Sequence, residues 1–186
     1  SSGFEAITSK ACSSLTDSLS EKCFLKSSLE CLRILLGFLF SFLNNTSDFS
    51  GTAQHAVAPL LSMTDTYGNP ALTWRAITAS WSPYVGLAGI TAMETLAGIL
   101  ATIGVIKMIT NIGKDYTAFA NGKAWAMLGG LCAIAVWGLG FMVVAGDWFM
   151  AWQAEENPLN TQLGALLYAL PSMMAVVIMM LHKEEA

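Results

Sequence analysis

Apolar residues in this chain are gathered into four long runs that are separated by polar segments. The clearest run extends from Tyr84 to Ile106, and its only ionisable side chain is that of Glu94. As an α-helix rising ~1.5 Å per residue, this run is about 34 Å long and can cross a bilayer core of ~30 Å. The pattern therefore predicts a transmembrane helix over about 83–107.

Two later runs, at about 124–146 and 161–182, are also long enough to span a membrane. The first of them carries no charged side chain and is rich in glycine and alanine, which allow neighbouring helices to pack closely. The second contains Pro171, which predicts a kink inside that helix. Both runs are predicted to be transmembrane helices.

The earliest run is less regular than the other three. Its uninterrupted apolar part, 34–43, is too short to cross a bilayer. A spanning helix over about 30–50 must continue through Asn44 and Asn45 toward Asp48, and polar side chains at that depth need partners. Alternatively, the membrane thins and the helix ends at Asn45. The pattern leaves both possibilities open.

Together, the four runs predict an all-α fold, a four-span transmembrane helix bundle. We expect the membrane domain to cover 29–182 and a serine-rich N-terminal arm to cover 1–28. The connection 46–82 holds no run able to span, but it has two short apolar patches at about 54–63 and 71–81. Because the second patch carries two tryptophans, which favour the headgroup level, we predict short interfacial helices in this first outer loop.

Charge predicts the orientation of the bundle. Four spans place both termini on the same side of the membrane, together with eight of the nine basic residues. The opposite side holds Arg75 as its only basic residue, among several acids. Because positive charge concentrates on the inner side of membranes, we expect both termini in the cytoplasm or the mitochondrial matrix.

Composition excludes several classes of function. Hydrophobic residues make up 54% of the chain and charged residues 12%, which does not fit a soluble globular domain. The net charge of −4 and the lack of a basic stripe argue against nucleic-acid binding. The four cysteines lack the spacing of a metal site, and no phosphate loop or hydrolase motif is present. We therefore expect no enzyme activity and no metal site.

Glu94 is the candidate site residue with the strongest physical argument. It lies near the middle of its run, where a carboxyl group costs a few kcal/mol if it faces lipid. Thr91, Thr95 and Gly98 fall on the same helical stripe, so we expect Glu94 to point into the bundle. Two roles remain open, a structural acid that ties helices together and the acid of a proton relay.

Histidines limit the cofactors that the chain could hold. His55 and His182 are its only histidines, and the expected topology places them on opposite sides of the membrane. They cannot jointly bind a metal or a haem within this chain. We expect no cofactor within the chain and bound lipid around it, with a quinone or haem contact possible only at an interface with a partner.

Several motifs resemble a bacterial family of predicted small integral membrane proteins, a four-span domain of unknown function. They are Asn44-Asn45-x-x-Asp48, Gln54-His55, Trp74-Arg75-Ala76-Ile77 and the segment from Gly146 to Gln153. The resemblance covers roughly 32–181, although this chain has Asp147 where the family usually has glutamate and differs after Gln153. It implies motif residues at Asn45, Asp48, His55, Arg75, Glu94, Asp147 and Gln153. Adding Asn44, we expect a polar cluster over the outer half of the bundle, with Arg75 paired to Asp48, Asp147 or Glu94.

Three functional hypotheses follow from these features. A bacterial-type membrane protein with a serine-rich arm and Ser1 in place of Met indicates a mitochondrial inner-membrane protein, with a bacterial inner membrane as the alternative. The first hypothesis is a non-catalytic accessory subunit of an inner-membrane complex, in particular of the respiratory chain, with other subunits and lipids as partners. The second is a small transporter or proton-linked carrier that uses Glu94, which requires a water-accessible volume leading to that residue. The third is a membrane anchor that contacts quinone or haem.

Overall fold

The computed structural model describes residues 36–37, 39–112, 116–154 and 160–181. Helices account for most of these residues, and no strand occurs among them. The predicted all-α class is therefore confirmed. Three helices have the length and composition to cross a membrane, at Ser82–Thr110, Thr117–Trp148 and Asn160–Leu181. They match three of the four predicted spans, whereas residues 30–35 and 38 of the first predicted span, 30–50, lie outside the described residues.

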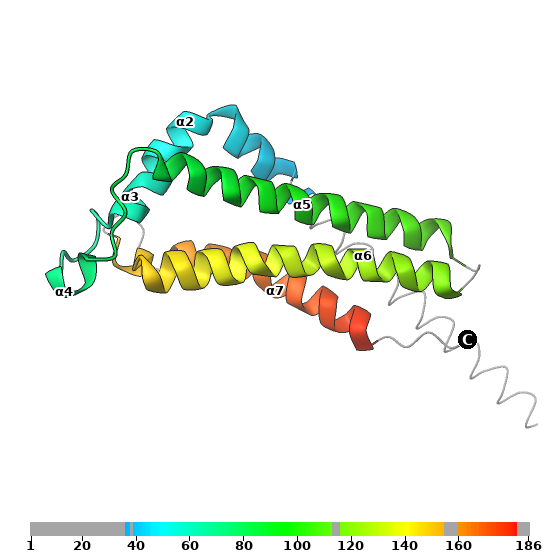
Figure 1. Ribbon diagram of the computed structural model, residues 1–186. Coiled ribbons are helices and arrows are strands. Elements are labelled where there is room, and N and C mark those ends of the chain that lie inside the picture. Colours follow the sequence, from blue (N-terminus) through cyan, green and yellow to red (C-terminus); the bar gives the residue numbers. More distant parts are fainter. Residues whose placement is uncertain (1–35, 38, 113–115, 155–159, 182–186) are drawn as a thin grey trace, which may run out of the picture.

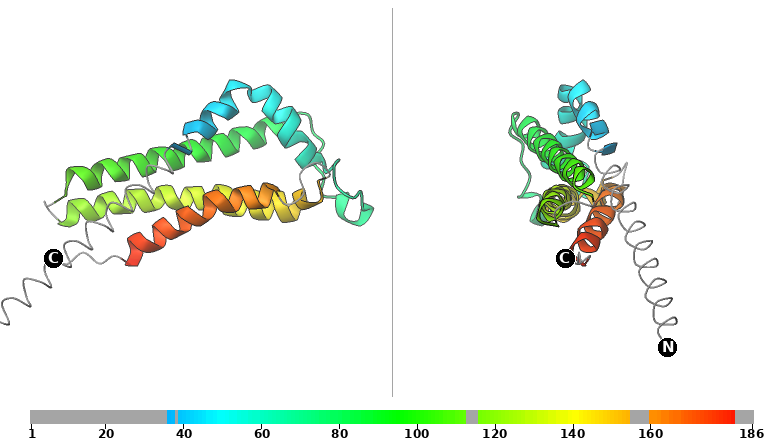
Figure 2. Two further views of the ribbon diagram at one scale, coloured as in Figure 1. Left: turned by 180° about the vertical axis from the view of Figure 1, so that it is seen from behind. Right: turned by 90° about the vertical axis from the view of Figure 1, so that its right-hand side faces the viewer.

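The three long helices are α5 (Ser82–Thr110), α6 (Tyr116–Ile134) with its continuation η2 (Ala135–Trp148), and α7 (Asn160–Leu181). They run side by side along the length of the molecule (Figures 1 and 2). The fourth predicted span, 161–182, thus agrees with α7 to within a residue, and Pro171 lies inside α7 without ending it.

Glycines bring α5 and α6 almost into backbone contact. A Cβ atom on Gly104 of α5 would overlap the backbone of Ala126 in α6. In return, a Cβ atom on Gly129 of α6 would lie 2.6 Å from the backbone nitrogen of Ala101 in α5. Because lipid tails provide no hydrophobic driving force between helices, such close van der Waals packing is what holds membrane helices together. The α5–α6 pair is therefore the most tightly packed part of the described fold.

The segment before α5 folds back along that helix. Residues 39–47 are helical, Asp48 accepts a hydrogen bond from the backbone N–H of Gly51, and three short helices follow. These are α2 (Phe49–Thr52), the π-helix η1 (Ala53–Val57) and α3 (Ala58–Ser62). Ala53 and Val57 pack on Leu87, so this arch lies against the N-terminal half of α5 (Figures 1 and 2).

The predicted interfacial helices are present only in part. The patch 54–63 is helical, but the second patch contains only the four-residue helix α4 (Pro70–Thr73). Residues 76–79, which follow α4, are not helical, because the backbone N–H of Ile77 donates to the carbonyl oxygen of Leu61 at 2.8 Å. This tertiary hydrogen bond replaces the local one that a longer helix would need.

The polar connection expected over 107–123 is mostly helical. Lys107 donates from Nζ to Asn121 Oδ1 at 2.8 Å and lies 5.8 Å from the ring centroid of Trp125. Asn111 donates from Nδ2 to the backbone oxygen of Lys107. Because these polar groups satisfy one another, α5 and α6 can extend past the apolar core into the headgroup region. The helices α5 and α6 thus continue beyond the ends at 107 and 124 of the predicted spans.

Candidate functional site

Glu94 lies on the inner face of α5 and has an exposed fraction of only 1%. Its Oε2 accepts hydrogen bonds from Ser41 Oγ at 2.8 Å and from Asn45 Nδ2 at 3.2 Å. Ser41 and Asn45 are one turn apart on the helix that covers 39–47, so one face of that helix supplies both donors. The carboxyl group therefore ties this helix to the middle of α5.

The second oxygen of Glu94 is in a different situation. Oε1 is buried and has no hydrogen-bond partner among the described residues. A buried polar atom without a partner costs on the order of 1–3 kcal/mol and needs a physical explanation. The explanation must come from what lies beside Glu94.

A cavity of about 480 Å³ lies beside Glu94. It is partly open, and its walls come from the helix at 39–47, the arch from α2 to α3, the N-terminal half of α5, η2 and the loop that contains η3 (Ala151–Gln153). The buried Glu94 and the partly buried Ser41 border it, together with the exposed side chains of His55 and Asp65. The cavity thus connects the buried acid with the end of the bundle that carries the acidic loops.

Trp137 supplies a second unpartnered polar group to this cavity. Its indole Nε1 is buried and makes no hydrogen bond within the described part of the chain. The ring stacks on Phe141 at a centroid distance of 4.7 Å and on Tyr168 at 4.6 Å. These two stacking contacts hold the indole ring beside the cavity, so its lining residues include a donor without a partner as well as the unpartnered acceptor of Glu94.

The backbone is irregular around the same cavity. The two π-helical segments within the described ranges, η1 and η2, contribute His55 and Trp137 to its wall. The two non-glycine residues with a left-handed backbone there, Met63 at φ 53° and Met150 at φ 57°, line it as well. Strained residues and π-helical turns persist where the surrounding structure holds them in place, and both gather at functional sites. Their coincidence marks this cavity as the candidate site.

Residues 27–182 match the model of a family described as predicted small integral membrane protein (DUF2165). That range includes every residue of the cavity. The chain belongs to this family. No curated protein and no solved structure matches it. The family assignment confirms the predicted resemblance and an integral membrane protein, and it carries no stated activity.

The structure brings together only part of the polar cluster expected from the DUF2165 resemblance. Asn45, His55 and Glu94 line the cavity. Asn44 is exposed and does not line it, and Asp48 serves as the N-cap of α2. The expected cluster of eight residues is therefore divided between the cavity wall and separate local contacts.

The remaining three residues of the expected cluster, Arg75, Asp147 and Gln153, do not line the cavity. Asp147 is exposed and accepts a hydrogen bond from Gln162 Nε2 at 3.4 Å. Gln153 is buried and accepts one from the backbone N–H of Tyr67 at 3.3 Å. Both residues organise the loops at the acidic end of the bundle.

Arg75 does not make the ion pair that its position among acids predicted. Its Nε donates to the backbone oxygen of Leu72 at 3.2 Å, and its guanidinium carbon lies 5.1 Å from the ring centroid of Trp148. Among the described residues, no acid pairs with Arg75. The predicted contact with Asp48, Asp147 or Glu94 is wrong because the aromatic face of Trp148 takes the place of a carboxylate.

Ser41 and Trp137 are functional candidates that the sequence prediction missed. Ser41 lies four residues before Asn45 and therefore on the same helical face, which was a usable signal. Trp137 lies in the middle of a predicted span, whereas tryptophans of the aromatic belt lie at span ends. A tryptophan at the centre of a span needs a partner for its N–H, so its depth could have identified it.

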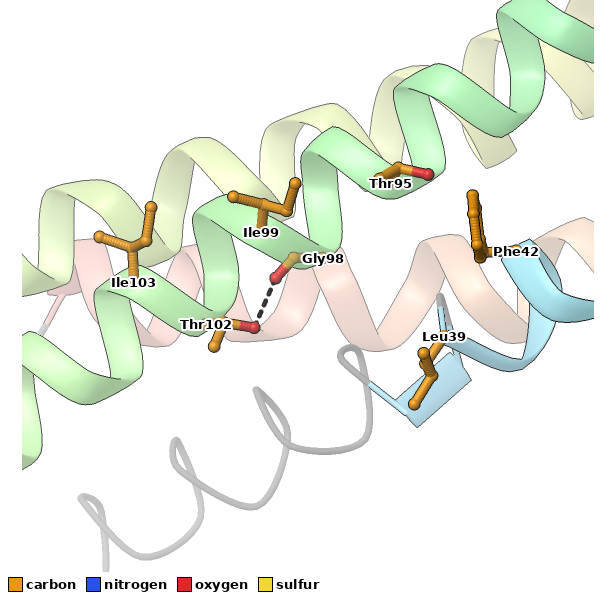
Figure 3. Close-up of a pocket in the computed structure, with 7 residues that line it drawn as sticks. All are labelled: Leu39, Phe42, Thr95, Gly98, Ile99, Thr102 and Ile103. Carbon is orange, nitrogen blue, oxygen red and sulfur yellow. Dashed lines mark hydrogen bonds between the residues drawn. The ribbon is translucent and has the colours of Figure 1, made fainter.

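A second, apolar groove of about 390 Å³ runs between the helix at 39–47 and α5. Leu39 and Phe42 form one side, and Ile99 and Ile103 lie along the other (Figure 3). The hydroxyl group of Thr102 donates to the backbone oxygen of Gly98 (Figure 3), and that of Thr95 donates to the backbone oxygen of Thr91. Neither hydroxyl is left as a free polar group in the groove.

Proposed function

We propose that this DUF2165 protein is a small proton-linked carrier in which Glu94 is the functional acid. The observation that carries the proposal is the cavity that reaches Glu94 from the acidic end of the bundle. A carrier needs a water-accessible volume at a titratable group near the middle of the membrane. In this proposal Oε1 of Glu94, which makes no hydrogen bond among the described residues, takes and releases the proton, while Oε2 keeps its two structural hydrogen bonds.

The packing supports a division into a fixed part and a movable part. The α5–α6 pair is held by glycine contacts that leave no space between the backbones. The helix at 39–47 is joined to α5 by hydrogen bonds from Ser41 and Asn45 to Glu94, and an apolar groove runs along its side. A change at Glu94 can therefore shift this helix without unpacking the core of the bundle.

The experiment is transport in proteoliposomes that contain the purified full chain and a trapped pH indicator. A panel of organic cations, organic anions and neutral solutes is added outside, and the internal pH is followed. We expect at least one solute class to drive a pH change in the wild type that is lost in Glu94→Gln, because an amide cannot titrate. Asp147→Asn is the matched control, since Asp147 is an exposed acid that does not line the cavity. Equal pH changes in wild type and Glu94→Gln, or none with any solute, would overturn the proposal.

A second candidate function is that of a non-catalytic accessory subunit of an inner-membrane complex, in its most specific form a complex of the mitochondrial respiratory chain. The apolar groove beside Ile99 favours it, because a transmembrane helix of a partner subunit can pack there without burying a free polar group. A quinone or haem contact at such an interface stays a prediction. Neither candidate assigns a catalytic step to this chain.

The groove is tested by a photoreactive amino acid placed at Ile99 in the native membrane. The control position is Leu131 on α6, because both side chains are equally exposed, at 51% and 50%. The subunit hypothesis predicts a defined protein adduct from position 99 that position 131 does not give. Adducts with lipid alone at both positions would contradict it.

A further inference from the structure

We propose that the cavity beside Glu94 binds a protonated organic amine with an apolar body, and that the ammonium group donates a hydrogen bond to Glu94 Oε1. This inference deepens the proposed carrier function, because it names the class of solute that would exchange with the proton. Binding itself does not require transport, so the two proposals can fail separately.

The charges around the cavity favour a cation. Its described lining contains two acids, Asp65 and Glu94, one histidine, His55, whose side chain is exposed, and no lysine or arginine. The basic residue expected on this side, Arg75, is already held by Leu72 and Trp148. A carboxylate in a low-dielectric site is costly without a nearby cation. A positively charged ligand would supply the counter-charge that the described protein groups do not.

The hydrogen-bonding groups define the ligand further. Glu94 Oε1 lacks a donor and the indole Nε1 of Trp137 lacks an acceptor. An ammonium N–H supplies the donor to Glu94 as a charge-assisted hydrogen bond, which is stronger than a neutral one. An oxygen of the ligand, or a water molecule beside it, supplies the acceptor to Trp137. A quaternary ammonium would satisfy the charge but not Oε1, so the structure favours an amine that retains an N–H.

The size and walls of the cavity define the rest of the ligand. A volume of about 480 Å³ is in the ~300–1,000 Å³ range of small-molecule sites. Apolar side chains form most of the wall, including Val57, Leu60 and Leu87, and Phe141 and Phe149 add aromatic rings. Aromatic faces attract cations as well as apolar groups. Among the described residues, no three side chains of the metal-binding types come together, so the wall lacks the donor set for a bare metal ion.

A proton and an amine would occupy Glu94 in turn. Oε1 can carry a proton, or it can accept a hydrogen bond from the ammonium group as part of a carboxylate. Binding of the amine therefore releases the proton to water, and protonation of Glu94 releases the amine. No covalent bond is formed or broken between heavy atoms. Because the proton and the amine cannot occupy Oε1 at the same time, the movement of one would be coupled to the movement of the other in a carrier.

The first experiment measures the binding of dibenzylamine to the full chain in detergent by isothermal titration calorimetry. Dibenzyl ether is the matched neutral probe, because it has nearly the same shape and no charge. We expect the wild type and Asp147→Asn to bind the amine equally and to bind the ether far more weakly. Glu94→Gln should weaken amine binding about ten- to a hundredfold, the range expected for loss of a hydrogen bond to a charged group. Equal affinity of wild type and Glu94→Gln, or equal affinity for amine and ether, would overturn the inference.

A second measurement uses only the wild-type protein, so it does not depend on the folding of a variant. A membrane-permeant carbodiimide modifies Glu94, and peptide mass spectrometry follows the loss of the unmodified peptide. An N-acylurea and an amide formed with the amine, which releases the urea, therefore both count as modification. Dibenzylamine should slow this modification and dibenzyl ether should not. Equal rates with both compounds would overturn the inference. Amine binding without proton movement would leave the inference standing and remove the carrier function, whereas proton movement driven only by other solutes would do the opposite.

Discussion

The hydrogen bonds at Glu94 Oε2 predict a clear difference between two substitutions. Glu94→Leu removes the acceptor of both Ser41 Oγ and Asn45 Nδ2, which donate to it at 2.8 and 3.2 Å. Hydrogen bonds between membrane helices contribute on average about 0.6 kcal/mol each and at most about 1.7 kcal/mol. Two lost bonds, with their donors left partly buried, should lower the free energy of unfolding by about 1–3 kcal/mol. Glu94→Gln keeps an oxygen for both donors and should cost less than about 1 kcal/mol.

The assay is equilibrium unfolding of the purified protein in mixed micelles, followed by tryptophan fluorescence. Ser41→Ala should cost about 0.6–1 kcal/mol in the wild type and nothing further in Glu94→Leu, where the acceptor is already gone. Ser47→Ala is the matched control, because Ser47 lies on the same helix, is exposed and bonds only to the backbone oxygen of Leu43. The reasoning would be refuted if Glu94→Gln were as unstable as Glu94→Leu, or if the Ser41 and Glu94 substitutions were additive.

Three further predictions concern the rest of the bundle. Arg75→Ala should lower the free energy of unfolding by only about 0.5–1 kcal/mol, the contribution of an exposed cation–π contact with Trp148, and a loss near 3 kcal/mol would indicate a buried ion pair instead. Gly104→Ala should destabilise the protein by about 1–3 kcal/mol in the same unfolding assay because its Cβ overlaps α6, whereas Gly89→Ala, with open space around it, should be neutral or stabilising. A cysteine at Asn121, in a background without the native cysteines, should react with a membrane-impermeant reagent from the basic face alone, and labelling from the acidic face would reverse the predicted topology.

The sequence was sufficient to predict the three long helices and the inward direction of Glu94. An isolated acid in an apolar run is stable only when it faces the bundle, and Thr91 and Gly98 on the same stripe are buried, while Thr95 is partly buried. Asn44 and Asn45 were expected at a depth where their amides need partners, and Asn45 does donate to Glu94, whereas Asn44 is exposed. These predictions succeeded because the membrane penalises every alternative placement of a polar side chain.

The cavity itself could not be predicted from the pattern. Met63 and Met150 adopt left-handed backbone angles that sequence reasoning assigns to glycine or asparagine. Likewise, the π-helical turns η1 and η2 carry no distinct local signal, because tertiary packing decides them. Arg75 was predicted from charge alone to pair with an acid. In the fold it lies against the ring of Trp148, a neighbour that the sequence pattern does not identify. The site depends on these non-local fits.

The most direct test of the central claim is whether water reaches Glu94 from the acidic end. In a background without the native cysteines, Ile90→Cys places a thiol on the cavity wall one turn before Glu94, and Met93→Cys places one on the exposed side of the same helix. The measurement is the rate at which a small, membrane-impermeant thiosulfonate labels each thiol in sealed vesicles. We predict labelling of position 90 from the acidic face, at least tenfold faster than at position 93, and slower labelling in the presence of dibenzylamine. Equally slow labelling of both thiols from that face would contradict the account.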